Sequence, residues 1–398
     1  MARVMIVAGG DWQVPLVAMA KEMGHTVLCT NLYKNSPAFA MADDFAVVDV
    51  LDKEKNLEIA QNWNPDIVIT DQSDIAVPTV AYISDKLNLL GIGEKKAHLF
   101  TNKYEMRCFE KEHGFQHPKF KLCNSYAEAK EFFDCWENDD AIIKPVDSQS
   151  SRGVYHITRN QEFFQEYMQA EKYSSSSSVI IEEYINGEEF TVDGIMLNGE
   201  YHTLAISKKK HYEHNAQIAS DLFFSWNDEK YDYEELEKVN KQHIVEAKLP
   251  FGLTHSEYKY FQGKYYLIEM AARGGGTLIS SDIAPFMSGV NGPKTLLKWL
   301  LGEKNTIKEC RDDKVALLHF INVKPGKINE IEGLEEASNI SGIHKIHLDF
   351  KVGDVLNAPN DDRGRAGFVI IFAKDKLELQ KKLQKFNNVL IIKSDRIS

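Results

Sequence analysis

The stretch YLIEMAARGGG, residues 266–276, decides how this chain folds. It is an apolar run that carries one carboxylate, Glu269, and ends in an arginine and three glycines. A second apolar run, GLTHSE at residues 252–257, ends in Glu257. The sequence FQGK at residues 261–264 lies between the two runs and predicts a hairpin turn. Two antiparallel strands joined by this turn would place Glu257 beside Glu269.

Two adjacent carboxylates repel each other, and a bound cation relieves the repulsion. Magnesium held by one or two carboxylates and completed by phosphate oxygens is the usual solution. Arg273 adds a planar fork that can bind a phosphate or a carboxylate. The pattern therefore indicates a site for a metal ion and a phosphorylated ligand. The alternative interpretation is a hairpin whose acids are solvated.

A short apolar strand is expected at residues 141–146, and it carries Lys144. A buried lysine is costly unless an anion meets it. The next residues, 147–154, form the polar loop DSQSSRGV, whose hydroxyls and backbone N–H groups suit a phosphate. The loop is not a Walker loop, because the Gly-Lys-Ser/Thr ending is absent. A plain turn is the alternative, since most Ser/Gly loops are only turns.

Two further segments carry clustered polar residues. In residues 179–192, VIIEEYINGEEFTV, two strand-like runs flank a connection that contains glycine and several acids. Residues 71–74, DQSD, follow a predicted strand at residues 66–70, at the edge where α/β sheets present ligands. A helix cap at Ser73 or Asp74 is an equally good interpretation of the second segment.

Taken in order, these motifs resemble those of the ATP-grasp superfamily, and the closest subgroup is the carboxylate–amine ligases that join amino acids, the L-amino-acid ligases. The motifs are Lys103 after Thr-Asn, Lys144 before a proline, the serine-rich loop, EEYI at 182–185, GEEF at 187–190, HSE at 255–257 and ExxxRGG at 269–275. Each motif is short and unspecific by itself, whereas their order and spacing are specific together. The resemblance covers essentially the whole chain.

The resemblance implies an α/β and α+β protein with an ATP-grasp fold in three parts. These are a Rossmann-like (pre-ATP-grasp) domain at residues 1–95, a nucleotide-binding and catalytic domain at 96–310, and a small α+β capping domain at 311–398. It also implies an ATP-dependent carboxylate–amine ligase that forms an amide or peptide bond through an acyl phosphate and releases ADP and phosphate. Another ATP-grasp enzyme, such as a carboxylase or a purine-pathway ligase, is the alternative. A catalytically silent nucleotide-binding protein is a further alternative.

The same resemblance assigns roles to individual residues. The ATP-binding residues are Lys103 and Lys144 at the α/β-phosphates, Ser150, Ser151 and Gly153 over the β/γ-phosphates, Glu182, Glu183, Tyr184 and Ile185 at the adenine, and Glu189 at the ribose. Glu257 and Glu269 would hold two magnesium ions, for which manganese is a substitute. The catalytic residues are Arg273, Ser151 and Gly275. Ala271 stands where many relatives have a metal-binding asparagine, so the second ion would have one protein ligand fewer or more water.

The composition of the chain limits the classes of molecule that it can bind. The 398 residues suggest two or three domains. A net charge of −12 leaves no basic surplus for a nucleic-acid backbone. Five scattered cysteines without C-x-x-C spacing indicate neither zinc nor a disulfide framework, and they fit the reducing cytoplasm. No run of 18 apolar residues occurs, so no membrane span is expected. The expected partners are a small-molecule carboxylate and an amine, and a homodimer is left open.

Several local structures are also expected. Residues 1–95 alternate strands and helices, which is typical of a parallel sheet. Gly9-Gly10-Asp11 lacks the full G-x-G-x-x-G pattern, so dinucleotide binding is rejected. Residues 96–113 predict one helix with Lys103 near its start. Residues 208–224 contain three lysines and two histidines and are the least regular segment, so we expect a loop that orders over the substrate.

Overall fold

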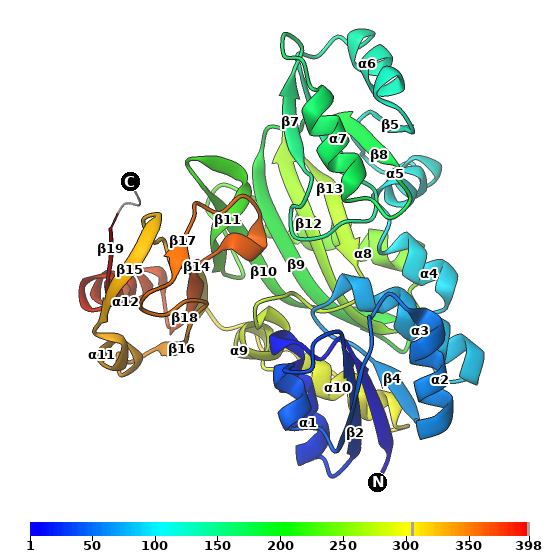
Figure 1. Ribbon diagram of the computed structural model, residues 1–398, viewed down its shortest axis with the longest axis vertical. Coiled ribbons are helices and arrows are strands. Elements are labelled where there is room, and N and C mark those ends of the chain that lie inside the picture. The colour runs from blue at the N-terminus through cyan, green and yellow to red at the C-terminus, as the bar shows by residue number, and fades with distance from the viewer. Residues whose placement is uncertain (304–305, 396–398) are drawn as a thin grey trace.

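The computed structural model describes residues 1–303 and 306–395 (Figure 1). Residues 304–305 and 396–398, which belong to the second and third expected domains, lie outside the described residues. The described chain forms four sheets with helices packed on them. Figure 1 shows the long strands of the largest sheet in the middle, the N-terminal sheet below, a small sheet above and the C-terminal unit at the left.

The N-terminal residues form a parallel sheet with the strand order β3-β2-β1-β4. Its strands are β1 (Arg3–Val7), β2 (Thr26–Asn31), β3 (Asp44–Val47) and β4 (Ile67–Ile69), and α1 (Val14–Glu22), α2 (Lys53–Trp63) and α3 (Val77–Leu87) follow β1, β3 and β4. Side chains alternate between the two faces of β1, so Val4 and Ile6 enter one core and Met5 and Val7 enter another. The predicted parallel sheet is confirmed.

Two helices, α4 (Glu94–Leu99) and α5 (Lys103–Glu112), stand where one helix was predicted over residues 96–113. The single helix is wrong because Asn102 is extended and caps the second helix. Its side chain accepts hydrogen bonds from the backbone N–H groups of Tyr104 and Glu105 at 3.0 and 3.1 Å. This cap starts α5 at Lys103 and fixes the position of that lysine.

A small antiparallel sheet with the order β5-β8-β6-β7 holds the strand that contains Lys144. The strands are β5 (Phe120–Cys123), β6 (Asp140–Pro145), β7 (Tyr155–Thr158) and β8 (Val179–Glu183), and the helices are α6 (Tyr126–Asp134) and α7 (Phe164–Lys172). The apolar core of this unit includes Ile143, Ile181 and Phe133. In the register, Ile142 pairs with Glu182, which brings the Glu-Glu-Tyr-Ile motif beside Lys144.

The largest sheet has eight strands in the order β13-β12-β9-β10-β11-β14-β18-β16, and all neighbours are antiparallel. Its first five strands are β9 (Glu188–Leu197), β10 (Glu200–Tyr212), β11 (Asn215–Phe224), β12 (Gly252–Phe261) and β13 (Lys264–Ala271). The predicted hairpin is β12 and β13, and Glu257 pairs with Glu269 in its register. Helix α8 (Tyr233–Glu246) lies between β11 and β12 in the sequence, and α9 (Ala284–Ser288) and α10 (Gly292–Leu300) follow β13.

The loop predicted for residues 208–224 is wrong, because these residues are the end of β10 and all of β11. Side chains alternate along β10, so its three lysines do not share one environment. Lys209 is buried between Glu189 and Glu257, whereas Lys208 lies 3.9 and 3.8 Å from Glu188 and Asp228. Charges that are paired in this way remove the apolar alternation by which a strand is normally detected.

The C-terminal residues extend the same sheet. The strands β14 (Val315–Phe320), β18 (Gly367–Ala373) and β16 (Ile343–Leu348) continue it beyond β11. A second, three-stranded sheet in the order β17-β15-β19 contains β15 (Gly326–Glu332), β17 (Val355–Leu356) and β19 (Ile391–Asp395), and the helices of this unit are α11 (Leu334–Ser338) and α12 (Lys376–Val389). The buried side chains of Ile371, Leu379 and Phe386 join these elements in one core.

Within the described residues, no helix combines the length and the apolar character that a bilayer span requires.

Replacement of Phe190 by alanine should destabilise the central sheet. Phe190 in β9 is fully buried, and its ring lies edge-on to Tyr231 and Tyr265 with centroids 4.9 and 5.8 Å apart. A cavity of this kind costs about 3–5 kcal/mol. Urea denaturation should therefore show a free energy of unfolding lower by that amount, whereas Phe164→Ala, at an exposed position of α7, should change it by less than about 1 kcal/mol. Equal effects of the two substitutions would contradict this core assignment.

Candidate functional site

The paired carboxylates of the hairpin lie where two cavities meet. The first cavity, of about 130 Å3, lies between the small sheet and the largest sheet and is lined by Lys103, Lys144 and Glu189. The second cavity, of about 500 Å3, extends to the N-terminal domain and to the C-terminal strands. The residues that line both include Ser150, Lys209, Glu257, Glu269, Asp362 and Arg365. A third cavity, of about 640 Å3, lies over α4 and α5, and none of the predicted site residues lines it.

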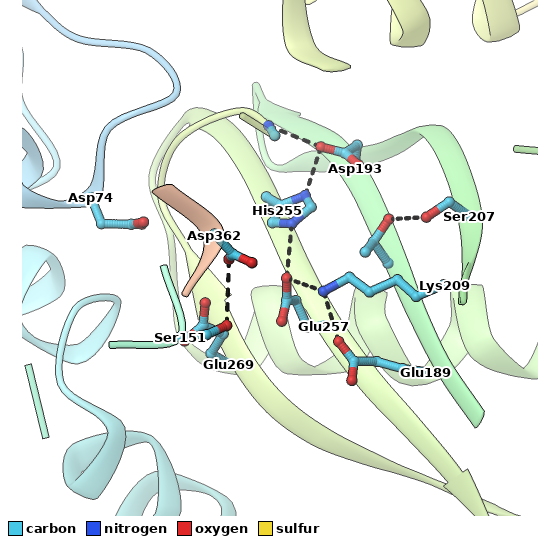
Figure 2. A network of polar contacts seen from close by, with 12 residues as sticks. Asp74, Ser151, Glu189, Asp193, Ser207, Lys209, His255, Glu257, Glu269 and Asp362 are labelled. Atoms are coloured by element: carbon cyan, nitrogen blue, oxygen red, sulfur yellow. Dashed lines mark hydrogen bonds and ion pairs between the residues drawn. The ribbon is translucent and has the colours of Figure 1, made fainter. Parts of the chain in front are cut away.

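Glu257 is held by buried cations (Figure 2). Lys209 Nζ lies 2.6 Å from Glu257 Oε1 and 2.7 Å from Glu189 Oε1, and His255 Nε2 lies 3.5 Å from Glu257 Oε1. Burial alone would raise the pKa of Glu257, but Lys209 and His255 outweigh it and hold the pKa well below its usual value. The carboxylate is therefore ionised at neutral pH.

Glu269, the partner of Glu257 in the hairpin register, is held by a different lysine. Lys103 Nζ lies 2.9 Å from Glu269 Oε2 and donates a hydrogen bond to the Ser148 carbonyl oxygen at 2.7 Å. Burial by itself would lower the pKa of Lys103. The negative charge of Glu269 outweighs this effect of burial, so the pKa of the lysine is raised. Each hairpin carboxylate thus has its own lysine, and the two acids lie side by side without a shared cation from the protein.

The donor set of this site fits magnesium that arrives with a nucleotide. Among the described residues, no group of three or more His, Cys, Asp or Glu side chains is placed to hold a metal ion. The protein therefore offers two carboxylates, Glu257 and Glu269, and phosphate oxygens and water would have to complete six ligands. The hydroxyl of Ser148, which also lines the first cavity, is buried without a hydrogen-bond partner in the described chain. Such an orphaned donor fits a phosphate oxygen in the first cavity.

A chain of buried charges lies behind the first cavity. Lys144 Nζ lies 2.7 Å from Glu182 Oε2, and Arg107 Nε lies 2.9 Å from Glu182 Oε1. Arg107 also binds Glu110 and donates to the carbonyl oxygen of Ile268 at 2.5 Å. Burial lowers the pKa of Lys144, because Glu182 is shared with Arg107 and does not offset the burial fully. Lys144 is therefore a cation that an incoming anion would stabilise.

The residues predicted to bind adenine line the first cavity together with these charges. Glu183 accepts hydrogen bonds from the side chain of Asn138 and from the backbone N–H of Lys119, at 2.9 and 3.2 Å. The ring of Tyr184 lies 4.1 Å from the ring of His156, and the Lys259 ammonium lies 4.9 Å from its centroid. The apolar side chain of Ile185 is buried. Tyr184 and Ile185 thus add apolar surface to a cavity that is otherwise lined largely by charged and polar residues.

The serine-rich loop is closed onto the C-terminal unit. Ser150, Ser151 and Gly153 all have positive φ, at 60°, 58° and 72°, which makes a tight loop. The Ser151 hydroxyl donates to the Gln217 carbonyl oxygen at 3.1 Å and lies 3.4 Å from Asp362 Oδ2, a contact drawn in Figure 2. Ser150 and Ser151 line the first cavity, whereas Gly153 lines neither cavity and packs against α7.

The glycine turn after β13 is docked on the N-terminal domain. Arg273 binds both oxygens of Asp74, at 2.9 and 2.6 Å, and donates to the carbonyl oxygen of Gly274 at 3.0 Å. The backbone N–H of Gly274 donates to Asp71 at 3.0 Å. Asp71 and Asp74 are therefore bound to this turn, which neither interpretation of residues 71–74 anticipated, and Ser73 forms no side-chain cap of the helix that follows. Arg273 lines the second cavity.

A buried aspartate and histidine connect this turn to Glu257 (Figure 2). Asp193 Oδ1 accepts from the backbone N–H of Gly275 at 3.0 Å and lies 2.9 Å from His255 Nδ1. A Cβ at position 275 would lie 2.5 Å from the same oxygen, so only glycine fits there. The backbone N–H groups of Gly274 and Gly275 are thus occupied by carboxylates of the protein itself.

Several residues of the site were not predicted from the sequence. They are Arg107, Glu110, Asp193 and Arg365, together with Lys209, which was assigned to a loop and not to the site. Arg107 and Glu110 gave a usable signal, because helical spacing places both on the same face of α5 as Lys103, and both are fully buried. Asp193 gave none, because it meets His255 and Gly275 only in the folded protein. Arg365 gave none for the site, because its nearby partner Asp362 does not show that the turn reaches the two cavities.

The His255–Asp193 pair predicts a pH dependence of stability. Burial would lower the pKa of His255, but Asp193 outweighs it and raises the pKa from 6.5 to about 9. A raised histidine pKa stabilises the fold fully below about pH 6.5, and the contribution disappears as the pH rises through 9. In a chelator, the free energy of unfolding should therefore fall by about 3 kcal/mol over this interval. His255→Gln should lack this fall, and parallel curves for the two proteins would disprove the assignment.

Two parts of the chain match known families. Residues 138–282 match the ATP-grasp domain, and residues 319–392 match the L-amino acid ligase C-terminal domain 2. The first match contains both hairpin carboxylates and the serine-rich loop. The second contains the turn that carries Arg365.

Curated relatives are distant and match in part. The chain is 25% identical over 194 residues to the formate-dependent phosphoribosylglycinamide formyltransferase of Prochlorococcus marinus, which is 48% of this chain and 50% of that protein. It is 21% identical over 260 residues to dapdiamide A synthase of Enterobacter agglomerans, which is 62% of this chain and 61% of the synthase. The chain therefore matches about half of the first relative's length.

A solved structure matches over the full length. The crystal structure of an L-amino acid ligase from Bacillus licheniformis superposes with a TM-score of 0.82, over 100% of this chain and 99% of that one, at 19% identity. At this identity the likeness is one of fold.

Proposed function

Because the chain belongs to the ATP-grasp superfamily and carries the C-terminal domain of the L-amino acid ligases, we propose that it joins a carboxylate to an amine in an ATP-dependent reaction. The product is an amide or peptide bond, and the intermediate is an acyl phosphate. The family and the fold class predicted from the motifs are confirmed.

One observation carries the proposal. Glu257 and Glu269 lie at the junction of the two cavities, and lysines line the first of them. A γ-phosphoryl group that extends from the first cavity and a carboxylate that enters from the second would meet at these two acids. Few other reactions require a triphosphate and a second small molecule to converge on a pair of metal-binding carboxylates.

The first cavity would hold ATP. The ammonium of Lys144, whose charge Glu182 offsets only in part, would bind the α/β-phosphates. Lys103, which pairs with Glu269, would bind them as well. Ser150 and Ser151 would cover the β/γ-phosphates. The proposed adenine and ribose residues are Glu182, Glu183, Tyr184, Ile185 and Glu189. Magnesium held by Glu257 and Glu269 would neutralise charge on the phosphates.

The chemistry follows from the poor reactivity of a carboxylate, whose leaving group would be oxide. A carboxylate oxygen attacks the γ-phosphorus, the bond to ADP breaks, and an acyl phosphate forms. The amine nitrogen then attacks the carbonyl carbon, loses a proton, and phosphate leaves. The protein has to hold three substrates together and exclude water while this occurs. The closed serine-rich loop and the C-terminal unit supply that exclusion.

Arg273 is the proposed contact for the donor carboxylate. Asp74 and Gly274 use three of its N–H groups, and an arginine has five in a fixed plane. The other two N–H groups are available on the side of the second cavity. Gly275 contributes through Asp193, which it holds in place, and Ser151 contributes by closing the loop.

The finer assignments belong to the same proposal. Two magnesium ions are expected, with manganese as a substitute, and Ala271 leaves the second ion to water or phosphate oxygens. The substrates are a small-molecule acid and an amine, the place of action is the cytoplasm, and a homodimer is the proposed assembly if the chain associates.

Glu269→Gln should lower turnover by roughly 10²-fold or more while the fold is kept. The amide retains the shape of the side chain but removes the negative charge that binds magnesium. Phosphate release with ATP and a pooled panel of acids and amines, formate included, measures the effect. Glu335→Gln, at an exposed position of α11, is the matched control and should behave like the wild type. Undiminished phosphate release from Glu269→Gln would refute the metal assignment.

Turnover should release ADP and phosphate in equal amounts, because the proposed step transfers the γ-phosphoryl group. Chromatography of the nucleotides after incubation with the same panel distinguishes ADP from AMP. Stoichiometric AMP with pyrophosphate would rule out the acyl phosphate and require an adenylate.

A further inference from the structure

The junction of the two cavities contains two cations, Lys209 and Arg365, among the residues that the structure describes. Among the other cations, Lys103, Lys144 and Lys259 line only the first of the two cavities, and Arg273 and Arg363 line only the second. Lys209 is fully engaged, because Glu189 and Glu257 each take its ammonium at less than 3 Å. Arg365 is therefore the cation at the junction that is open to a ligand.

Arg365 is buried in an unusual environment for an arginine. Its side chain is 13% exposed, and its guanidinium carbon lies 3.7 Å from the centre of the Phe320 ring. Nη2 lies 2.7 Å from Asp362 Oδ1, and Nε donates to the Ala219 carbonyl oxygen at 3.2 Å. Nη1 has no partner in the described part of the chain. The stacked ring fixes the plane of the guanidinium and leaves one edge of it unsatisfied.

Arg365 and Arg273 differ in how far their charge is compensated. Burial would lower the pKa of Arg273, but the bidentate Asp74 carboxylate outweighs it and raises the pKa. Burial lowers the pKa of Arg365, and the single contact with Asp362 does not restore it. A buried cation in this condition gains stability from a further anion.

The turn that carries Arg365 is attached to the loop that would cover the phosphates. The backbone N–H of Asp362 donates to the Ser150 carbonyl oxygen at 3.3 Å, and Ser151 Oγ lies 3.4 Å from Asp362 Oδ2 (Figure 2). Asp362 therefore binds both the loop and the guanidinium. The position of Arg365 is therefore tied to the position of the loop through Asp362.

We propose that Arg365, supplied by the C-terminal domain, contacts the phosphoryl group as it moves from ADP to the donor carboxylate. The inference rests on the proposed ligase function and adds a catalytic residue to it. In the transfer, the γ-phosphorus forms a bond to a carboxylate oxygen and its bond to the ADP oxygen breaks. Negative charge is then spread over the three phosphoryl oxygens, and a planar guanidinium can donate two hydrogen bonds to them.

The test uses the full-length protein and two probes. The first is ADP production with ATP, magnesium and a mixture of the twenty L-amino acids. The second is the affinity for magnesium–ADP with and without aluminium fluoride, which mimics the phosphoryl group in transfer. Arg365→Gln should lower kcat by roughly 10²–10³-fold. It should weaken the fluoride complex by a similar factor and leave the affinity for ADP alone nearly unchanged.

Control variants separate this role from a structural one. Lys351→Gln, at an exposed position of the same C-terminal unit, removes a cation that lines neither cavity and should match the wild type. Arg365→Lys keeps the charge but loses the fork, so it should recover part of the fluoride affinity. If Arg365→Gln does not fold, Arg365→Lys carries the test, with an expected loss of at least about tenfold in both readouts.

The outcomes are distinct. Wild-type kcat and fluoride affinity in Arg365→Gln, or in Arg365→Lys where that variant carries the test, would overturn the role of Arg365 and leave the proposed function standing. A wild-type protein that produces no ADP with any acid and amine would overturn the proposed function. In that case, an unchanged fluoride complex in the variant would overturn the Arg365 assignment as well.

Discussion

The register of the β12–β13 hairpin is the constraint on which the rest of the site depends. It sets Glu257 opposite Glu269 on one face of the sheet. Because side chains alternate with a period of two, a slip of one residue would turn one carboxylate to the other face. The two-residue turn, in which Gln262 and Gly263 both have positive φ, sets the register from Lys264 opposite Phe261 to Leu267 opposite Tyr258. Continued unchanged, this register would pair Glu257 with Ile268. A β-bulge at Ile268 shifts the register by one residue and puts Glu269 opposite Glu257, so the turn and the bulge together fix the position of the two acids.

Two adjacent carboxylates in a partly buried place require positive charge, and the fold supplies it from elements that are far apart in the sequence. Lys103 comes from the start of α5, Lys209 from β10 and His255 from β12 itself. Each of these cations is balanced by a second polar partner, so the network persists without a ligand. Lys144, Lys259 and Arg365 also line the cleft, and burial lowers the pKa of all three. Incompletely compensated cations thus lie in the first cavity and at its junction with the second.

The sequence was sufficient for features whose determinants are local. The turn at residues 261–264 and its two apolar runs predicted the hairpin, and the motifs predicted the fold and the family. The contacts that complete the site join residues far apart in the chain: His255 and Asp193 are 62 residues apart, Arg107 and Glu182 are 75, and Arg273 and Asp74 are 199. A local pattern shows which residues carry charge and not which of them meet. The strands β10 and β11 were missed for a related reason, because paired charges replace the apolar residues that normally mark a buried strand.

The largest sheet runs without interruption from β13 in the ATP-grasp part to β16 in the C-terminal unit, and the joint between the two parts is the ladder between β11 and β14. The C-terminal unit is therefore more than a cover, since it occupies what would otherwise be a free sheet edge. A chain without it would present the unpaired N–H and C=O groups of β11, with Leu222 and Phe224 beside them, as a template for other strands. The C-terminal unit therefore cannot be lost without exposing this edge of the largest sheet.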